Sequence, residues 1–403
     1  MTLPGADPGD DVRQVSKLRL CFISNPNLVH TRRWVNWFAG RGHTVCLLAD
    51  VPLKEAWNLE SWNQVQVIDL SKLFYARYIR FPVWTLWLRN FLHHWQPDVL
   101  HAHRINSAGW LAAASGFHPY VVTPWGTDIF VQPEDSRFAR FLAHYVLRHA
   151  DLVTTLSHAM GEAAVKLGAR VETLRGIQFG VELDIFKPFP PTSLGSQEFR
   201  RSLSLPVNAR LVLSPRAVTP IYNLDVILQA IPLVKERFSE AVFIFVEYNT
   251  DRAYKKRLDE LAAQLGLEGW IRWIPATRSR AEMAELYRLC EVVVSVPSTD
   301  GTPVSVLEAM ASGKPVVCTD LAPLREFITH AENGLLVPVR QVGPLAEAII
   351  QLLEHPGQAG EFGSRAHQVV VSVANAEVEM QRMEGLYHQL AGSRKSMDRS
   401  LSR

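Results

Sequence analysis

Short apolar runs alternate with longer stretches of helical spacing along most of the chain. The first run, 18–24, ends at Asn25-Pro26, and a stretch with apolar positions every three or four residues follows at 31–39. Runs that are apolar at every position predict strands buried on both faces, and the helices between them predict a parallel sheet. In the first half the expected strands are 18–24, 44–49, 65–70, 98–102, 120–123 and 151–155.

The alternation stops near residue 188 and begins again near residue 207. The segment 188–206 is rich in proline and serine, which is typical of a linker. Beyond it the pattern ends in helical stretches from Pro344 and from about Ala376. The expected strands of the second half are 211–214, 242–246, 271–274, 291–296, 315–318 and 334–337.

We therefore predict an α/β protein with two doubly wound, Rossmann-like domains that face each other across a cleft. Open α/β sheets bind ligands at the carboxyl ends of their strands, so the cleft is the expected site. The expected divisions are a disordered leader at 1–16, a first domain at 17–187, the linker at 188–206, a second domain at 207–374, a helix at 375–392 that crosses back to the first domain, and a tail at 393–403.

Composition narrows the class of protein. The 403 residues include 42 Lys+Arg and 40 Asp+Glu, so no broad positive field suggests a nucleic-acid partner. The four cysteines lie singly in apolar runs and are expected to be free core thiols, which suit a reducing cytosol. Residues 1–16 lack the order of a signal peptide, and no apolar run is long enough to span a membrane. We expect a cytoplasmic protein that contacts the inner face of the cell membrane at most peripherally.

The most informative segment is 298–317, STDGTPVSVLEAMASGKPVV, which follows an expected strand and opens a helix. Backbone N–H groups at the positive end of such a helix attract a pyrophosphate. Asp300 lies in the turn and Glu308 about two helical turns further on, so both carboxylates can accept hydrogen bonds from sugar hydroxyls. The alternative is that Asp300 caps the helix and Glu308 lies on its solvated face.

This segment resembles the E-x7-E motif of the family-4 (group 1) retaining glycosyltransferases, which have the GT-B fold. The resemblance extends over about residues 18–390 and includes RGHTV at 41–45, DVLHAH at 98–103, GVELDIFKP at 180–188 and ENGLLV at 332–337.

The resemblance implies transfer of a sugar from a nucleotide donor, held by the second domain, to an acceptor held by the first. By the family's roles, Asp300 contacts hydroxyls of the donor sugar and Glu308 contacts the ribose. A UDP- or GDP-sugar is the expected co-substrate, with no further cofactor. The turn residues implied to bind sugar and pyrophosphate are Gly301, Thr302, Val304 and Ser305.

The departures from the family pattern lie mainly at positions that are expected to contact the donor phosphates. Arg216 matches an arginine after the first strand of the second domain, and its planar guanidinium suits phosphate oxygens, although a structural ion pair is the alternative. No lysine occurs within 219–223, where the family has one; Asn223 supplies a weaker hydrogen bond or caps a helix. Asp300 is one methylene shorter than the family's glutamate, and Pro303 brings no N–H group.

On the first domain, TPWGTD at 123–128 aligns with a family segment T-x-H-G-x-D whose histidine lies near the donor sugar. Trp125 replaces that histidine; its ring can stack on a sugar but cannot accept a proton. His103 is an alternative catalytic histidine, although a structural role is the other reading. The remaining candidates are Asp128, which binds acceptor hydroxyls or caps the following helix, and, on the acceptor side, His30 and Arg104.

The negative charge that develops on the leaving group indicates which residues the mechanism needs. A departing nucleoside diphosphate needs preorganised cations and N–H dipoles, which Arg216 and the turn at Gly301 provide. Asp300 and Glu308 belong to one motif, so a glycosidase-type covalent intermediate is the poorer reading. The family is thought to use same-face attack, and no ligand spacing suggests a metal. The expected catalytic set is Asp300, Arg216, Asp128 and His103.

Segment 72–95 holds basic and aromatic residues without any Asp or Glu. This mixture suits a membrane interface, and a helix packed on the core is the alternative. We therefore predict a metal-independent, retaining hexosyltransferase that acts on a saccharide or lipid-linked acceptor in surface-glycan assembly. The alternatives are a nucleotide-sugar epimerase of the same fold and a non-catalytic nucleotide-sugar binder.

Overall fold

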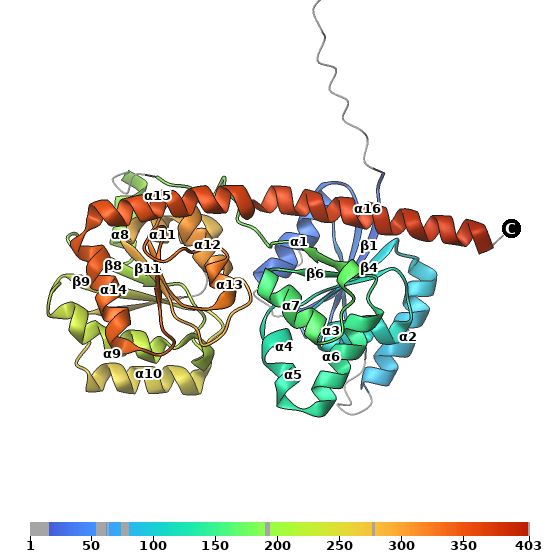
Figure 1. Cartoon of the computed structure of the whole chain (residues 1–403), viewed down its shortest axis with the longest axis horizontal. Coiled ribbons are helices and arrows are strands. Elements are labelled where there is room, and N and C mark those ends of the chain that lie inside the picture. The colour runs from blue at the N-terminus through green and yellow to red at the C-terminus, as the bar shows by residue number, and fades with distance from the viewer. Residues whose placement is uncertain are drawn as a thin grey trace, which may run out of the picture.

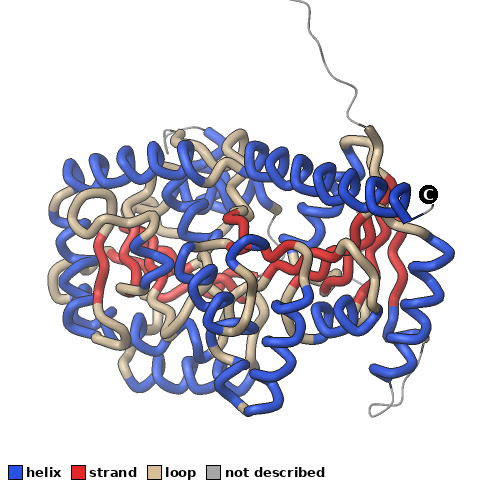
Figure 2. Tube along the Cα trace, turned by 45° about the vertical axis from the view of Figure 1, so that its right-hand side comes forward, coloured by secondary structure: helices blue, strands red, loops and turns tan. Residues whose placement is uncertain are grey.

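The computed structural model describes residues 16–53, 62, 64–73, 80–189, 194–275 and 279–401. Two lobes lie side by side, and helices α15 (Pro356–Val373) and α16 (Ala376–Leu401) run along one side of both (Figure 1). In each lobe the strands form a central layer between helices (Figure 2). The predicted leader lies outside the described residues except for Ser16. The two-domain α/β prediction is confirmed.

The N-terminal lobe is built on a seven-stranded sheet with the order β3-β2-β1-β4-β5-β6-β7, and each pair of neighbouring strands is parallel. Its central strands are buried almost throughout, as their continuous apolar sequence predicts. The strands are β1 (Arg19–Ser24), β2 (Thr44–Ala49), β3 (Gln66–Asp69), β4 (Val99–His103), β5 (Tyr120–Thr123), β6 (Leu152–Thr155) and β7 (Leu174–Gly176). The helices are α1 (Val29–Gly40), α2 (Arg80–Trp95), α3 (Ser107–Ser115), α4 (Thr127–Phe130), α5 (Gln132–Asp135), α6 (Arg137–His149) and α7 (His158–Lys166).

The C-terminal lobe has a six-stranded parallel sheet in the order β10-β9-β8-β11-β12-β13. The strand order reverses between β8 and β11, which is where such sheets bind ligands. Its strands are β8 (Arg210–Ser214), β9 (Ala241–Glu247), β10 (Ile271–Pro275), β11 (Val292–Ser295), β12 (Val316–Thr319) and β13 (Leu335–Val337). Its helices are α8 (Leu194–Ser202), α9 (Leu224–Lys235), α10 (Arg252–Gln264), α11 (Arg280–Leu289), α12 (Val304–Ala311), α13 (Ala322–Arg325) and α14 (Val342–Glu354).

The segment predicted as a linker differs from expectation. Residues 194–202 form α8, which packs against α11, and the fully buried Ser196 donates a hydrogen bond to Glu285 at 2.9 Å. The two chain crossings between the lobes instead meet at Gly180, whose φ is +63°. A Cβ there would lie 2.5 Å from the Cα of Ala376, so only glycine fits beside the start of α16.

Helix α16 fastens the C-terminal end of the chain to the N-terminal lobe. Glu384 accepts hydrogen bonds from Arg41 at 3.0 Å and from His43 at 2.7 Å, in the turn between α1 and β2. The buried Tyr387 reaches His101 in β4 and Trp34 in α1. These polar contacts make α16 part of the core of a lobe that is distant from it in sequence.

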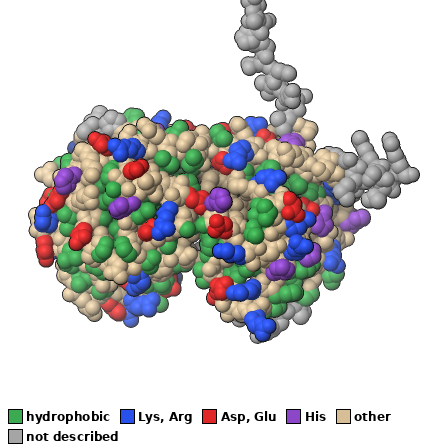
Figure 3. All heavy atoms as spheres, in the orientation of Figure 1, with side chains coloured by type: hydrophobic (Ala, Val, Ile, Leu, Met, Phe, Trp, Pro, Cys, Tyr) green, Lys and Arg blue, Asp and Glu red, His purple; other side chains and the backbone are tan. Residues whose placement is uncertain are grey.

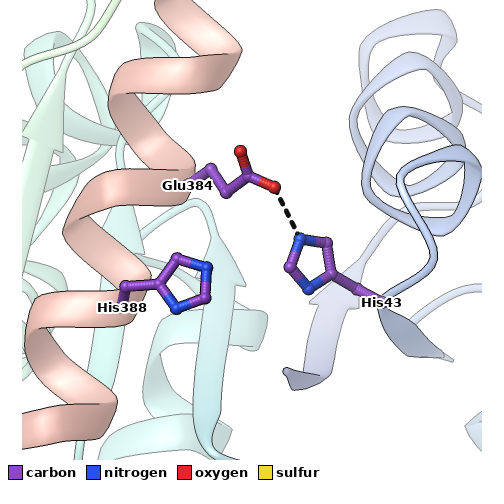
Figure 4. A group of neighbouring side chains, drawn as sticks. All are labelled: His43, Glu384 and His388. Carbon is purple, nitrogen blue, oxygen red and sulfur yellow. Dashed lines mark hydrogen bonds and ion pairs between the residues drawn. The ribbon is translucent and has the colours of Figure 1, made fainter. Parts of the chain in front are cut away.

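His43, Glu384 and His388 also form, among the described residues, one group whose ligand atoms lie within 4.8 Å of one another (Figure 4). The Nδ1 atom of His43 accepts the N–H of Leu18 at 3.0 Å, so a neutral ring carries its proton on Nε2 and donates it to Glu384. If a metal ion bound Nε2 of the neutral ring, the proton would have to move to Nδ1, where it would point at the N–H of Leu18. The hydrogen bonds therefore explain this group as a contact that holds α16 on the N-terminal lobe.

The surface view shows charged side chains of both signs scattered over both lobes (Figure 3), in keeping with the small net charge.

Helix α2 covers part of the 72–95 segment. Its Trp84 is buried, and Trp87, Phe91 and Trp95 stack in series against the core. The described part therefore matches the core-packed alternative, while residues 74–79 lie outside the described residues. No helix in the described ranges combines the length and apolar character that crossing a membrane requires.

Candidate functional site at the domain interface

The turn before α12 brings an arginine and an aspartate together. Arg216, which follows β8, contacts Asp300 at 2.7 Å and donates to the hydroxyl of Ser305 at 3.0 Å. The other oxygen of Asp300 accepts the N–H of Gly301 at 2.9 Å. Burial raises the pKa of Asp300, and the guanidinium beside it opposes that rise. The pair thus forms a rigid, charged floor at the amino end of α12.

Glu308 lies just over one turn into α12 and is buried, and the Asp300 side chain is 12% exposed. One of its oxygens contacts Arg280 at 3.0 Å, and the other accepts the hydroxyl of Tyr287 at 3.2 Å. Burial raises the pKa of Glu308, with Arg280 the main opposing charge. The alternative of a solvated Glu308 is excluded by this burial.

Arg280 also connects the two lobes, a role that no local sequence pattern predicts. It pairs with Glu182, in the crossing between the lobes, and Arg33 of α1 lies 3.5 Å from the same carboxylate. The chain Arg33–Glu182–Arg280–Glu308 therefore spans the interface. Its members come from four separate segments, so no local motif marks it.

Two predicted donor residues, Thr302 and Asn223, make structural hydrogen bonds in this arrangement. The hydroxyl of Thr302 donates to the carbonyl of Leu156 in the opposite lobe at 2.7 Å. Asn223, in the left-handed region with φ +49°, donates to Val296 and Ser298 and accepts from Arg340. It makes no side-chain cap, so it acts as a buried tether between two loops. Val304, by contrast, begins α12 and lines the cavity described below.

Asp128 is fully engaged by backbone groups. Its Oδ1 accepts the N–H groups of Trp125 and Gly126, and its Oδ2 accepts that of Ile105, all at 2.9 Å. It is 3% exposed. The structure therefore gives Asp128 the task of shaping the loop that carries Trp125, and it leaves neither oxygen directed at an acceptor.

Trp125, His30 and His103 meet in an aromatic wall of the N-terminal lobe. His30 stacks on Phe179 at a centroid distance of 4.7 Å, and Trp125 lies edge-on to both rings. His103 lies 5.4 Å from Trp125, and its Nδ1 faces Ser24 at 3.1 Å. Burial lowers the pKa of His103 to about 3 and that of His30 well below its usual value. Both rings are therefore neutral at physiological pH.

These two half-sites enclose a cavity of about 360 Å³. Trp125 and His30 line one side, and Arg216, Asp300 and Glu308 line the other. A second cavity, of about 950 Å³, shares His30, Phe179 and Arg280 with the first and extends toward the start of α16. The structure thus brings most of the predicted residues to one interface, while Arg104 lies behind Trp125 with its Cζ 5.4 Å from the ring centre.

Comparison with known proteins identifies the family. A family model described as glycosyl transferases group 1 matches residues 195–369, and one described as glycosyl transferase 4-like matches residues 19–157. The chain belongs to the group 1 glycosyltransferases. The two matches divide this family member as its two sheets do, with the group 1 model on the C-terminal lobe and the 4-like model on the N-terminal lobe.

Curated relatives agree at low identity. The D-inositol 3-phosphate glycosyltransferase of Streptomyces bingchenggensis is 27% identical over 248 residues, which are 58% of this chain and 53% of that protein. A second such enzyme, from Catenulispora acidiphila, is 27% identical over 222 residues, or 53% of this chain and 50% of the relative. The chain thus aligns with about half the length of these relatives.

Solved structures match over almost the whole chain. The crystal structure of Anabaena HepE in complex with UDP-glucose covers 93% of this chain and 100% of its own, with a TM-score of 0.78 and 19% identity. WaaG, a glycosyltransferase involved in lipopolysaccharide biosynthesis, covers 91% of this chain and 99% of its own, with a TM-score of 0.67 and 12% identity. These likenesses establish the GT-B fold of this group 1 glycosyltransferase.

Proposed function

We propose that this protein transfers a hexosyl group from a nucleoside diphosphate sugar to a saccharide or lipid-linked acceptor in surface-glycan assembly. The observation that carries the proposal is the pairing of Arg216 with Asp300 at the amino end of α12, with Glu308 about one turn into that helix, across a cavity from Trp125. The UDP-glucose complex of HepE, whose fold this chain shares, supports a UDP-sugar, and GDP-sugars are the second choice.

In this proposal the residues act on charge rather than on protons. Arg216 and the first N–H groups of α12 stabilise the negative charge that develops on the leaving phosphate. Asp300 fixes the guanidinium and presents its carboxylate to sugar hydroxyls, while Glu308 accepts hydrogen bonds from the ribose. The neutral His103 contributes no positive charge and, with a pKa of about 3, is a weak base.

We propose retention of the anomeric configuration without a metal. A double displacement needs a carboxylate on the face opposite the leaving group. Asp128, the acidic candidate on that side, has three backbone N–H groups on its two oxygens. Such hydrogen bonds stabilise the carboxylate and reduce its nucleophilicity. Same-face attack is the remaining route, and activity in EDTA together with the product's anomeric coupling constant tests both parts.

A thermal-shift screen with UDP, GDP, ADP and their hexose conjugates tests the donor site. Wild-type protein should be stabilised by one nucleotide series, and Glu308→Gln and Arg216→Met should lose most of that shift. The matched controls are Glu240→Gln and Arg325→Met, which change exposed residues. Absence of a shift with every nucleotide at millimolar concentration would contradict the proposal. Turnover of the donor without any acceptor would instead favour an epimerase or hydrolase.

We further propose that the protein works in the cytoplasm, in peripheral contact with the inner face of the membrane. Helix α6 supports this more than the 72–95 segment does, because Phe138 and Phe141 are 68% and 57% exposed beside the exposed Arg137 and Arg148. These residues are spaced along one helical face, and basic and aromatic residues together suit anionic lipid. Loss of vesicle binding in Phe138→Ser/Phe141→Ser, but not in Leu86→Ser on α2, would support this face; the reverse pattern would return the contact to α2.

A further inference from the structure

The donor end of the cavity lacks the charge that its proposed ligand requires. Arg216 is the cation at the amino end of α12, but Asp300 at 2.7 Å already balances its charge. A nucleoside diphosphate brings additional negative charge into this buried place. Uncompensated buried charge is unfavourable, so a second cation is needed near the phosphates.

The segment that should supply a lysine supplies an aromatic ring instead. Within 219–223 the side chain beside Arg216 is Tyr222, whose ring centre lies 4.2 Å from the guanidinium carbon of Arg216. A tyrosine can orient the arginine by this contact, but it carries no positive charge. Arg280 lines the same cavity but is already paired with Glu182 and Glu308, so we look for the second cation on another element.

Arg104, on the N-terminal side of the cleft, packs behind Trp125. It follows β4 and is partly buried, and its guanidinium makes no ion pair or side-chain hydrogen bond with any residue of the described ranges. Its contact is with the ring of Trp125, 5.4 Å from the guanidinium carbon. Because no carboxylate among the described residues balances its charge, this cation is available to an anion.

The backbone holds Arg104 in a conformation that few residues other than glycine adopt. Its φ is +82°, in the left-handed region. The N–H of Arg104 donates to Thr123 at 2.7 Å, and the N–H of the next residue, Ile105, donates to Asp128 at 2.9 Å. Such an outlier persists where its surroundings fix it, and it is often found at functional sites.

Arg104 is close to the donor turn through the loop of Trp125. A Cβ on Gly301 would lie 2.8 Å from the carbonyl oxygen of Trp125, so this loop touches the donor turn. Trp125, Tyr222 and Tyr248 line the cavity that also holds Arg216 and Asp300. Burial and Tyr222 raise the pKa of Tyr248, and the charge of Arg104 opposes that rise. The charge of Arg104 therefore acts on this cavity from behind Trp125.

We propose that Arg104 binds the diphosphate of the nucleotide donor and supplies, from the N-terminal lobe, the positive charge that the C-terminal lobe lacks. Trp125, in place of a histidine, is then the platform that orients this guanidinium. The inference rests on the proposed function. Because the arginine comes from the lobe opposite the donor motif, it acts only when the cleft is closed, and its effect should fall more on kcat than on ground-state binding.

The test uses Arg104→Met and Arg104→Lys in the full-length protein, with Arg175→Met on an exposed arginine of the same lobe as control. Calorimetry with UDP and UMP, or with the base that the screen identifies, is combined with donor kinetics. Arg104→Met should lower kcat by between about 10-fold and 100-fold, as expected for loss of a charged hydrogen bond. It should weaken binding of the diphosphate more than that of the monophosphate. Arg104→Lys should recover part of both.

Three results would overturn the inference. If Arg104→Met retains the melting temperature, diphosphate affinity and kcat of the control while Glu308→Gln loses nucleotide, the proposed function stands and this inference is wrong. If only the KM for the acceptor rises, Arg104 recognises an anionic acceptor instead. If the wild-type protein binds no nucleotide, the proposed function and the inference fail together.

Discussion

Replacing Gly301 by alanine tests whether the closed cleft is the active arrangement. A Cβ at this position would lie 2.8 Å from the carbonyl oxygen of Trp125, 2.9 Å from the Cε of Met160 and 3.1 Å from the Cα of Gly126. All three atoms belong to the opposite lobe. The φ of Gly301 is not in the left-handed region, so alanine should not strain its own backbone.

The size of the effect follows from these distances. Ordinary contact begins at 3.4 Å, so the opposing loop must retreat by roughly 0.6 Å from the 2.8 Å contact. Met160 can rotate its methyl group away, but a backbone carbonyl cannot. A misplacement of about 1 Å can cost on the order of 100-fold in rate, so we expect kcat to fall by on the order of 10-fold or more. Affinity for the nucleotide alone should change less than kcat, because its proposed contacts, apart from that with Arg104, lie on the C-terminal lobe.

Steady-state kinetics and nucleotide calorimetry on Gly301→Ala measure both quantities. Gly385→Ala is the matched control, because a Cβ at Gly385 in α16 meets nothing within 4 Å. Gly301→Ala with unchanged kcat would refute the reasoning, since the packed interface would then play no part in catalysis. Loss of nucleotide binding equal to the loss of kcat would show that alanine disturbs the donor turn itself.

Two further predictions concern charge and stability. Burial would raise the pKa of Glu384, but Arg41 and His43 beside it outweigh burial and lower this pKa, so the ionised carboxylate stabilises the fold above the unfolded pKa of about 4.3, and this stabilisation is lost as pH falls through the folded pKa. In denaturant unfolding, Glu384→Gln should be about 1–3 kcal/mol less stable than wild type at pH 7, and this difference in stability should disappear in acid. A difference in stability that does not depend on pH would contradict the role of Glu384 in holding α16. Burial lowers the pKa of His103 to about 3, so between about pH 6.5 and pH 3 the unfolded chain binds a proton at His103 that the folded protein does not, and the stability of the fold should decrease as pH drops through that window. His103→Asn should reduce this loss of stability and leave the pH–activity profile between pH 6 and 8 in the same position. A shifted profile would instead show that His103 titrates during catalysis.

The sequence pattern predicted the two sheets well because their strands are buried on both faces. Apolar runs such as 18–24 and 291–296 correspond to β1 and β11, and both sit at the centre of their sheets. The sequence pattern did not predict one element at the edge of a sheet and one in the segment between the domains. Strand β7, Leu174–Gly176, is short and partly exposed, and α8 lies in a segment whose prolines and serines favoured a linker.

The candidate site was predicted only where one local motif held its residues. Asp300 and Glu308 could be paired from their spacing, and Arg216 from its place after a strand. Asn223 and Asp128 were expected to bind ligands or cap helices, but their partners, Ser298, Arg340 and Ile105, lie on other segments. Burial of such polar groups is decided by tertiary contacts that no spacing records.

The same limit explains why the interface network escaped prediction. Arg33, Glu182 and Arg280 lie in separate segments, and each alone looks like an ordinary surface charge. A buried arginine requires a partner, so the network becomes evident only when the lobes are assembled.

A crystal structure of the protein with UDP, or with the nucleotide that the thermal screen identifies, tests the central claim most directly. The account predicts the diphosphate at the amino end of α12, in contact with Arg216, and the ribose hydroxyls on Glu308. A nucleotide bound elsewhere, for instance wholly within the 950 Å³ cavity beside the start of α16, with Arg216 still engaged only by Asp300 and Ser305, would contradict it.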